Sequence, residues 1–344
     1  MFRMKIRKLI YCLILFAVLL PAGAKAEPSR VSSLLVEAET GRVLFSENPA
    51  EKRYPASLTK MMTLYLVFDA LEKGDIQMDQ LLTVSKKAAG MPRSRMGLKE
   101  NTTISVENAV FAMISRSAND AAVVIAEGLA GSEAQFADKM TRTARELGMK
   151  NTRFKNASGL HNKDQVTTAQ DMAILSMALI QHFPEYYKLF SVRGFRYGNR
   201  YYGNHNLVAR FYKGGDGLKT GYVDASGYHV VGSAIRDGKR LIGVVMGRNS
   251  VRERDRHIFR LLDLGFAALK NKTENVATLD DASVFAPLKE ETPASSLSEY
   301  RRMRIAAHVL SEELDRISSV EKSLQTEQNT NVVKNAIIDW GKKK

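Results

Sequence analysis

The alternation of hydrophobic and polar residues predicts a β-hairpin near each end of the region 31–247. Residues 31–45, VSSLLVEAETGRVLF, contain two β-rich runs joined by Glu39-Thr40-Gly41. Residues 227–235 and 240–247 flank the turn Arg236-Asp237-Gly238-Lys239, in which Asp-Gly supplies the positive φ angles of a tight turn. Strands are therefore expected both before and after the segment that separates the two hairpins.

Hydrophobic residues at helical spacing fill the region between the hairpins. Four helices are predicted, over residues 57–71, 106–129, 132–147 and 168–182. Thr168 and Asp171 have the spacing of a capping box at the start of the last one. A further helix is expected over residues 254–264, after which Gly265-Phe266 closes the unit. A sheet whose strands bracket a helical insertion is an α+β arrangement in layers.

The first 26 residues are predicted to be a signal peptide, which implies export to the periplasm or the outer face of the cytoplasmic membrane. Four basic residues precede an apolar run over residues 9–20, and Ala24-Lys25-Ala26 is an A-x-A cleavage signature. An uncleaved anchor is the alternative, but the apolar run is short for a membrane span. Cys12 is the only cysteine, so the mature chain would have no disulfide, thiol nucleophile or thiolate metal site.

Cleavage would leave 46 Lys and Arg against 37 Asp and Glu, a formal charge of +9. This excess suits an anionic partner. A nucleic-acid partner is not expected, because an exported protein seldom meets one and no zinc-finger or RNP pattern occurs. Cell-wall polymer or an anionic membrane surface fits better, and a solvated basic face with no specific role stays open.

From Asn271 onward the composition shifts toward charged residues, Ser and Thr. The segment 296–324 has hydrophobic residues at roughly helical spacing, which predicts a partly helical tail over residues 271–344. The terminus 332–344 has the composition of a short basic amphipathic helix that contacts a membrane. It could equally pack on the domain formed by residues 27–270, or be disordered.

Ser57 and Lys60 are the first candidates for chemistry. They lie three residues apart and so share one face of a helix. The following residues, 61–68, are apolar all round, as in a buried helix. Burial lowers the pKa of a lysine, and a neutral lysine can take a proton from a serine hydroxyl. Alternatively, Ser57 caps the helix and Lys60 extends to solvent. The pattern alone decides nothing, because it recurs at residues 319–322.

Two further polar stretches favour the catalytic interpretation. Ser117-Ala118-Asn119 interrupts a strongly apolar helical pattern, as a loop that projects polar groups into a cleft would. Lys219-Thr220-Gly221 occurs once, at the start of the strand that begins the second hairpin. Its glycine allows close backbone approach, and its Thr and Lys suit a substrate carboxylate. Ser-x-x-Lys, Ser-x-Asn and Lys-Thr-Gly in this order are the signature of active-site-serine enzymes that recognise penicillin.

The chain resembles the D-alanyl-D-alanine carboxypeptidases among the low-molecular-mass penicillin-binding proteins. The likeness runs from about residue 31 to residue 266, through PASLTKMMT, SRSANDAAVVIAEGLAG and DGLKTGYVDASGYHVVGSA. It implies an α/β/α sandwich of the β-lactamase type over residues 27–270, without metal or cofactor. The implied activity in cell-wall maturation is removal of the terminal D-alanine from peptidoglycan pentapeptides through an acyl-enzyme, with β-lactams as covalent inhibitors.

The resemblance also implies roles for single residues. Ser57 would be the acylated nucleophile and Lys60 its general base. Ser117 and Lys219 would pass the proton to the leaving D-alanine. The backbone N–H groups of Ser57 and Tyr222 would form the oxyanion hole. Which base acts in acylation differs between accounts of the wider superfamily.

Substrate binding falls, by the same resemblance, to a second set of residues. Asn119 would hold the amide backbone of the substrate, and Thr220 would bind its terminal carboxylate. Arg254 is expected to bind the same carboxylate, with Arg252 as a nearby rival. The six histidines are scattered and are interpreted as structural, and neither a Gly-x-Ser-x-Gly elbow nor a His-Glu-x-x-His helix occurs.

Three departures from the family pattern leave alternatives open. Tyr222 stands where many relatives have histidine, which affects deacylation or substrate preference but not the N–H role. Residues 211–215 form an unusual lead into the Lys-Thr-Gly strand, and the tail lacks the alternation of a second β-domain. An endopeptidase or β-lactamase of the same fold is the alternative, although residues 159–162 lack the Glu-x-x-Leu-Asn loop of class A β-lactamases. A non-catalytic wall-binding protein is a third.

Overall fold

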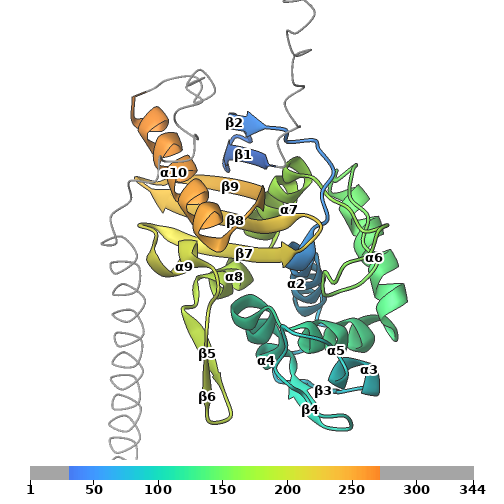
Figure 1. The fold of residues 1–344 in the computed structure, drawn as a ribbon. Helices are drawn as coiled ribbons and strands as arrows, with labels where there is room; N and C mark the ends of the chain where they lie inside the picture. The colour runs from blue at the N-terminus through green and yellow to red at the C-terminus, as the bar shows by residue number, and fades with distance from the viewer. Residues whose placement is uncertain (1–30, 272–344) are drawn as a thin grey trace, which may run out of the picture.

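A five-stranded antiparallel sheet forms the centre of the computed structural model, which describes residues 31–271 (Figure 1). The strands, in the order β2-β1-β9-β8-β7 across the sheet, are β1 (Ser32–Glu37), β2 (Val43–Glu47), β7 (Gly215–Val223), β8 (Gly227–Arg236) and β9 (Lys239–Arg248). Both predicted hairpins are confirmed, as β1–β2 and β8–β9. Asp237 and Gly238 have φ angles of 51° and 73°, as the tight turn requires.

The predicted helical insertion between the two hairpins is also confirmed. Its longer helices are α2 (Thr59–Glu72), α4 (Val106–Phe111), α5 (Asn119–Ala130), α6 (Glu133–Glu146) and α7 (Ala169–His182). Thr168 caps α7, as predicted, by accepting a hydrogen bond from the Asp171 N–H at 3.0 Å. The hydrophobic pattern does not predict the short elements β3 (Leu81–Thr83), α3 (Lys86–Ala89), β4 (Thr103–Ser105), α8 (Pro184–Tyr187), η3 (Lys188–Ser191), β5 (Gly194–Tyr197), β6 (Arg200–Gly203) and α9 (Leu207–Phe211).

The predicted helix over residues 106–129 is interrupted. Helix α4 continues as a π-helical turn, η2 (Ala112–Arg116), and α5 begins only after Ser117. Ser117 has a left-handed φ of 60°, which ends helical hydrogen bonding in this direction. The polar interruption in the sequence therefore marks a real break between two helices.

Helices cover both faces of the sheet. Helix α10 (Val251–Lys270) packs on β8 and β9 around Val245 and Ile258, whereas α7 packs on the opposite face, which carries Val244. The α+β fold with helix, sheet and helix layers is thus confirmed. The predicted end at Gly265-Phe266 is wrong, because α10 continues to Lys270. Gly265 does not end the helix but allows it to pack closely on the sheet, since a Cβ at this position would stand 2.5 Å from Leu35.

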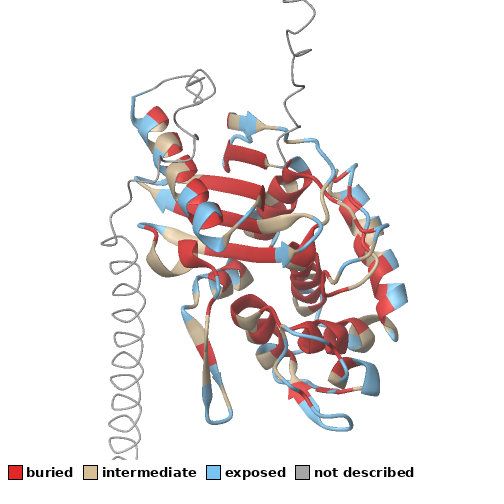
Figure 2. Ribbon diagram, in the orientation of Figure 1, coloured by how far each residue is buried: buried red, intermediate tan, exposed pale blue. Residues whose placement is uncertain are grey.

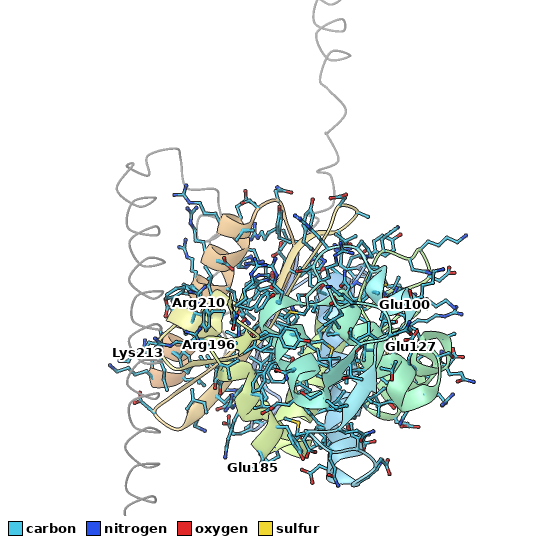
Figure 3. All side chains as sticks on the ribbon, turned by 90° about the horizontal axis from the view of Figure 1, so that it is seen from below. Glu100, Glu127, Glu185, Arg196, Arg210 and Lys213 are labelled. Atoms are coloured by element: carbon cyan, nitrogen blue, oxygen red, sulfur yellow. The ribbon has the colours of Figure 1, made fainter. Side chains whose placement is uncertain are left out.

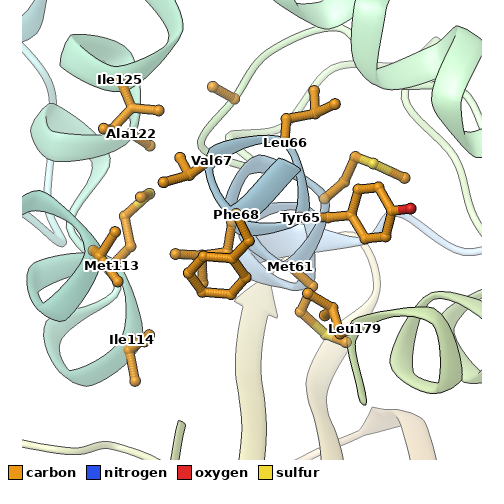
Figure 4. Packing of buried hydrophobic residues seen from close by; sticks show 14 of the residues in the cluster. Met61, Tyr65, Leu66, Val67, Phe68, Met113, Ile114, Ala122, Ile125 and Leu179 are labelled. Atoms are coloured by element: carbon orange, nitrogen blue, oxygen red, sulfur yellow. The ribbon is translucent and has the colours of Figure 1, made fainter. Parts of the chain in front are cut away.

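Helix α2 runs through the middle of the helical side and is buried around nearly its whole circumference (Figure 2). Met113 and Ile114 of η2 and Ile125 of α5 line one side of it, and Leu179 of α7 lies on the other (Figure 4). A helix that is apolar all round was predicted to be buried, and this is confirmed. The residues directly before α2 are therefore joined to a rigid core helix.

Several sequence predictions lie outside the described residues. These are the signal peptide over residues 1–26 and the charged tail over residues 271–344, of which only Asn271 is described, and the domain bounds 27–270 stay a prediction with them. Between residues 31 and 271, none of the helices combines the length and apolar character needed to cross a bilayer.

Candidate active site

Ser57 lies in the 3₁₀ turn η1 (Ala56–Leu58), directly before α2. Neither the turn nor α2 begins with a side-chain cap, so the interpretation of Ser57 as a helix cap is wrong. Ala56 has a φ of 48°, a left-handed conformation that costs a non-glycine residue about 1–3 kcal/mol. Such strain is typical of positions where the backbone must present a reactive group.

Lys60 projects from the first turn of α2 and is fully buried, so the interpretation that it extends to solvent is wrong. Its Nζ lies 3.2 Å from Ser57 Oγ and 2.8 Å from Asn119 Oδ1, and it also contacts the carbonyl oxygen of Ser158. The amide and carbonyl oxygens can only accept. A neutral amine can donate its two hydrogens to them, which leaves its lone pair for the hydroxyl of Ser57.

The pKa values of both buried lysines are lowered. Burial lowers the pKa of Lys60 well below its usual value, and the charge of Lys219 lowers it further, while Asp120 and Glu133 raise it. Burial and the neighbouring Arg254 lower the pKa of Lys219 to about 7. The direction for Lys60 is the one that the sequence argument requires of a general base.

Lys219, Thr220 and Gly221 lie inside β7, an edge strand that pairs with β8. The prediction that they begin the strand of the second hairpin is wrong, because β7 is a separate strand and the hairpin is formed by β8 and β9. Lys219 Nζ donates to the carbonyl oxygen of Thr220 at 2.9 Å. Ser117 Oγ is buried and makes no hydrogen bond within the described residues, as expected for a group that meets a ligand.

A cleft of about 630 Å³ lies beside these groups. Its wall includes Ser57, Ser117, Asn119, Thr220, Gly221, Tyr222 and Arg254. Arg254 is 5% exposed and pairs with Asp255 at 2.7 Å, whereas Arg252 is exposed and does not line the cleft. Of the two arginines, only Arg254 therefore lies in the wall of the cleft.

Two glycines bring other segments against the backbone of the nucleophile. A Cβ at Gly159, which has a φ of +85°, would lie 1.9 Å from the carbonyl oxygen of Ala56. A Cβ at Gly221 would lie 3.2 Å from the Ser57 nitrogen, so β7 packs tightly on η1, as the glycine in Lys-Thr-Gly predicts. This packing holds β7 against the turn that carries Ser57, and both Ser57 and Tyr222 line the cleft.

The motif search missed several residues that shape the cleft. Asp120 accepts hydrogen bonds from the backbone N–H groups of residues 96–98, which fixes the loop whose Ser94 lines the cleft. His161 and His205 also line the cleft, which the interpretation of all histidines as structural does not anticipate. That interpretation is confirmed for the buried His229, which bonds to the Tyr54 carbonyl oxygen and the Gly247 N–H. The positions of Asp120, His161 and His205 follow only from the three-dimensional packing.

Comparison with known proteins agrees with this geometry. The family model described as D-alanyl-D-alanine carboxypeptidase matches residues 22–250. The chain belongs to this family. D-alanyl-D-alanine carboxypeptidase DacF of Bacillus subtilis is 36% identical over 245 residues, which are 69% of this chain and 62% of DacF. The chain thus spans less than two thirds of the length of this relative.

Two solved structures of penicillin-binding proteins have the same fold. Penicillin binding protein 5 of Haemophilus influenzae aligns with a TM-score of 0.67 and 36% identity, over 69% of this chain and 70% of that one. A penicillin-binding protein of Listeria monocytogenes in the cefotaxime-bound form aligns with a TM-score of 0.63 and 32% identity, over 68% and 96%. The β-lactamase and penicillin-binding-protein type of fold is therefore shown for this chain.

Tyr222 is one of the positions at which we expected a departure from the family pattern. Its side chain is 51% exposed and its ring packs on Tyr228, with centroids 4.2 Å apart. The hydroxyl donates to Asp224. Tyr222, Asp224 and Tyr228 line both the catalytic cleft and an adjoining hollow of about 990 Å³. A substitution of Tyr222 would therefore alter the shape of the cleft more than its charge.

Proposed function

We propose that this protein is a serine-type D-alanyl-D-alanine carboxypeptidase that removes the terminal D-alanine from peptidoglycan pentapeptides. The observation that supports this most is the hydrogen bond between a fully buried lysine, Lys60, and Ser57, which lines a cleft that Arg254 also lines. A nucleophile, a base of lowered pKa and a cation for a free carboxylate are the groups that the reaction requires. Family membership supports the same substrate class.

In the proposed acylation step, neutral Lys60 accepts the proton of Ser57 as Oγ attacks the carbonyl carbon of the penultimate D-alanine. The N–H groups of Ser57 and Tyr222 stabilise the negative charge that develops on the carbonyl oxygen. Thr220 and Arg254 hold the terminal carboxylate, and Asn119, which already bonds Lys60, holds the amide backbone of the substrate. The peptide nitrogen then leaves as D-alanine after it receives a proton through Ser117 and Lys219.

Water completes the proposed cycle by hydrolysing the ester on Ser57. The same step is expected to be slow after acylation by a β-lactam, since Asp224 is the only carboxylate among the described residues that line the cleft. Its partner is the hydroxyl of Tyr222. The cleft thus offers no free carboxylate base for a deacylating water, which favours a carboxypeptidase over the alternative of a β-lactamase.

Labelling with penicillin tests this function. Incubation of the protein with benzylpenicillin should give a covalent adduct that mass spectrometry locates on Ser57, and release of D-alanine from a soluble pentapeptide should be lost in Ser57→Ala. Rapid loss of the adduct would favour a β-lactamase instead. Adduct formation that survives Ser57→Ala, or no D-alanine release by the unmodified protein, would show that the proposal is wrong.

The pH dependence of the reaction tests the role of Lys219. Its pKa is about 7, so the protonated amine that passes a proton toward the leaving D-alanine is lost as the pH rises through that value. We expect kcat/KM for a pentapeptide to fall on the alkaline side with a midpoint near this pKa. Removal of the positive charge in Arg254→Gln should raise the pKa of Lys219 and move the alkaline limb to higher pH.

Arg252→Gln is the matched control for that experiment, because it removes the same charge from the same helix at an exposed position. Its pH profile should superpose on that of the unmodified protein. An equal displacement in both variants, or an alkaline limb that Arg254→Gln leaves in place, would contradict the assignment.

We further propose that the protein acts outside the cytoplasm, as the predicted signal peptide implies. The positive charge expected of the mature chain suits the anionic cell wall. Contact of the tail with a membrane, proposed from its composition alone, is tested by fractionation of cells that express the chain with and without residues 332–344.

A further inference from the structure

A band of positive charge runs from the hairpin β5–β6 into the catalytic cleft. Residues 193–213 contain five basic residues and no Asp or Glu: Arg193, Arg196, Arg200, Arg210 and Lys213. Figure 3 shows Arg196, Arg210 and Lys213 on one side of the molecule, and Glu100 and Glu127 on the opposite side. The segment that forms the hairpin and leads away from it therefore carries positive charge and no acidic side chain.

The hairpin carries arginine and tyrosine together on each of its two faces. In the register of β5 and β6, Arg196 lies opposite Tyr201 and the adjacent pair is Tyr197 with Arg200. Neighbouring pairs in a two-stranded ribbon point to opposite faces. Both arginines are exposed, and all three tyrosines of the hairpin, with Tyr202 the third, are partly accessible. Each face thus offers a guanidinium beside a ring with a hydroxyl.

The base of the hairpin is fixed, and its far end projects beyond the core (Figures 1 and 2). Phe195 is buried and stacks on Phe111 of α4, with ring centroids 5.9 Å apart, and on Tyr202 at 5.6 Å. The guanidinium of Arg200 lies 5.1 Å from the centre of the Tyr202 ring. Packing of the aromatic base therefore holds the arginines in place away from the core.

The chain that follows the hairpin continues to the catalytic cleft. Strand β6 ends at Gly203, and the next two residues, Asn204 and His205, line the catalytic cleft together with Arg210. The His205 N–H donates to the carbonyl oxygen of Ser115, in the turn that precedes Ser117. An anionic chain held by the hairpin would thus lie at the entrance to the cleft.

We propose that the β5–β6 hairpin is a docking surface for polymeric peptidoglycan, and that Arg196 and Arg200 bind carboxylates of stem peptides other than the one in the cleft. This inference rests on the proposed function, in which the substrate itself ends in a carboxylate that the polymer repeats. Guanidinium groups bind carboxylates in bidentate fashion. Charge on both faces of a thin ribbon suits a mesh that surrounds it, whereas a membrane surface contacts one face.

Co-sedimentation with purified peptidoglycan sacculi tests the docking surface, with the full chain carrying Ser57→Ala so that no substrate is consumed. Arg196→Gln with Arg200→Gln should weaken binding about three- to tenfold and reduce its salt dependence. Arg142→Gln with Arg145→Gln removes two equally exposed charges from α6, distant from the hairpin in Figure 1, and should bind as the parent does. Lysine at both hairpin positions should restore part of the binding.

Activity gives an independent measurement. In the chain with Ser57 intact, the hairpin variant should lose more kcat/KM on polymeric peptidoglycan than on a soluble pentapeptide, and the α6 variant should keep the parent ratio. Equal losses in the two double variants, unchanged sacculus binding, or a loss of binding to anionic phospholipid vesicles alone would overturn the proposal. Arginine-dependent sacculus binding by a chain that releases no D-alanine would refute the proposed activity but support the docking surface.

Discussion

Lys60→Ala should reduce the second-order rate constant for acylation by penicillin about 10²- to 10⁴-fold. The physical reason is the hydrogen bond of 3.2 Å between Lys60 Nζ and Ser57 Oγ, because it joins the nucleophile to the base. A serine hydroxyl without such a base is a weak nucleophile at neutral pH. Stopped-flow measurement with a fluorescent penicillin gives the rate, and the thermal unfolding midpoint shows whether the variant folds.

A second variant separates the base from its charge. Lys60→Arg keeps a cation, but a guanidinium stays protonated in proteins and cannot accept the serine proton. Acylation should therefore be lost in this variant as well. Lys322→Ala, in the other Ser-x-x-Lys pattern of the chain, should leave the rate unchanged. Fast acylation in a folded Lys60→Arg protein would show that Lys60 acts through its charge and not as a base.

The sequence predicted those parts of the fold that local patterns determine. The Asp-Gly turn, the two hairpins and the apolar helix α2 each follow from a short stretch of residues, and each is present. The end of α10 could not be predicted, since Gly265 resembles a helix stop until Leu35 and Leu241 of the sheet are seen against it. Short elements such as β5 and β6 were missed because arginines and glycines obscure the alternation of their apolar residues.

The site divides along the same physical line. Ser57, Lys60 and Lys219 could be named from their motifs, and the structure brings them into and beside one cleft. The third partner of Lys60 is the backbone carbonyl oxygen of Ser158, which carries no side-chain signal. The packing of the folded chain places Lys60 between two acceptors and a hydroxyl. The lowered pKa of a buried lysine could be expected from the sequence, but the positions of these three partners could not.

Gly159→Ala should slow acylation by penicillin although the residue takes no part in the proposed chemistry. The new Cβ would stand 1.9 Å from the carbonyl oxygen and 2.4 Å from the carbonyl carbon of Ala56, both backbone atoms of the turn that carries Ser57. Either this turn or the segment that supplies the Ser158 carbonyl oxygen to Lys60 must move. A displacement of about 1 Å at a reacting group can reduce the rate about 10²-fold, which is the loss of acylation rate that we expect.

Gly148→Ala is the control for that substitution. Gly148 has a φ of +89°, close to the +85° of Gly159, but no heavy atom lies within 4 Å of its Cβ position. Both substitutions therefore have a similar cost in backbone conformation, about 1 kcal/mol or somewhat more, and only Gly159→Ala adds the collision with Ala56. Urea unfolding should show a small loss of stability in Gly148→Ala with an unchanged acylation rate. If both variants lost activity equally, left-handed strain and not contact with the nucleophile's turn would explain the requirement for glycine.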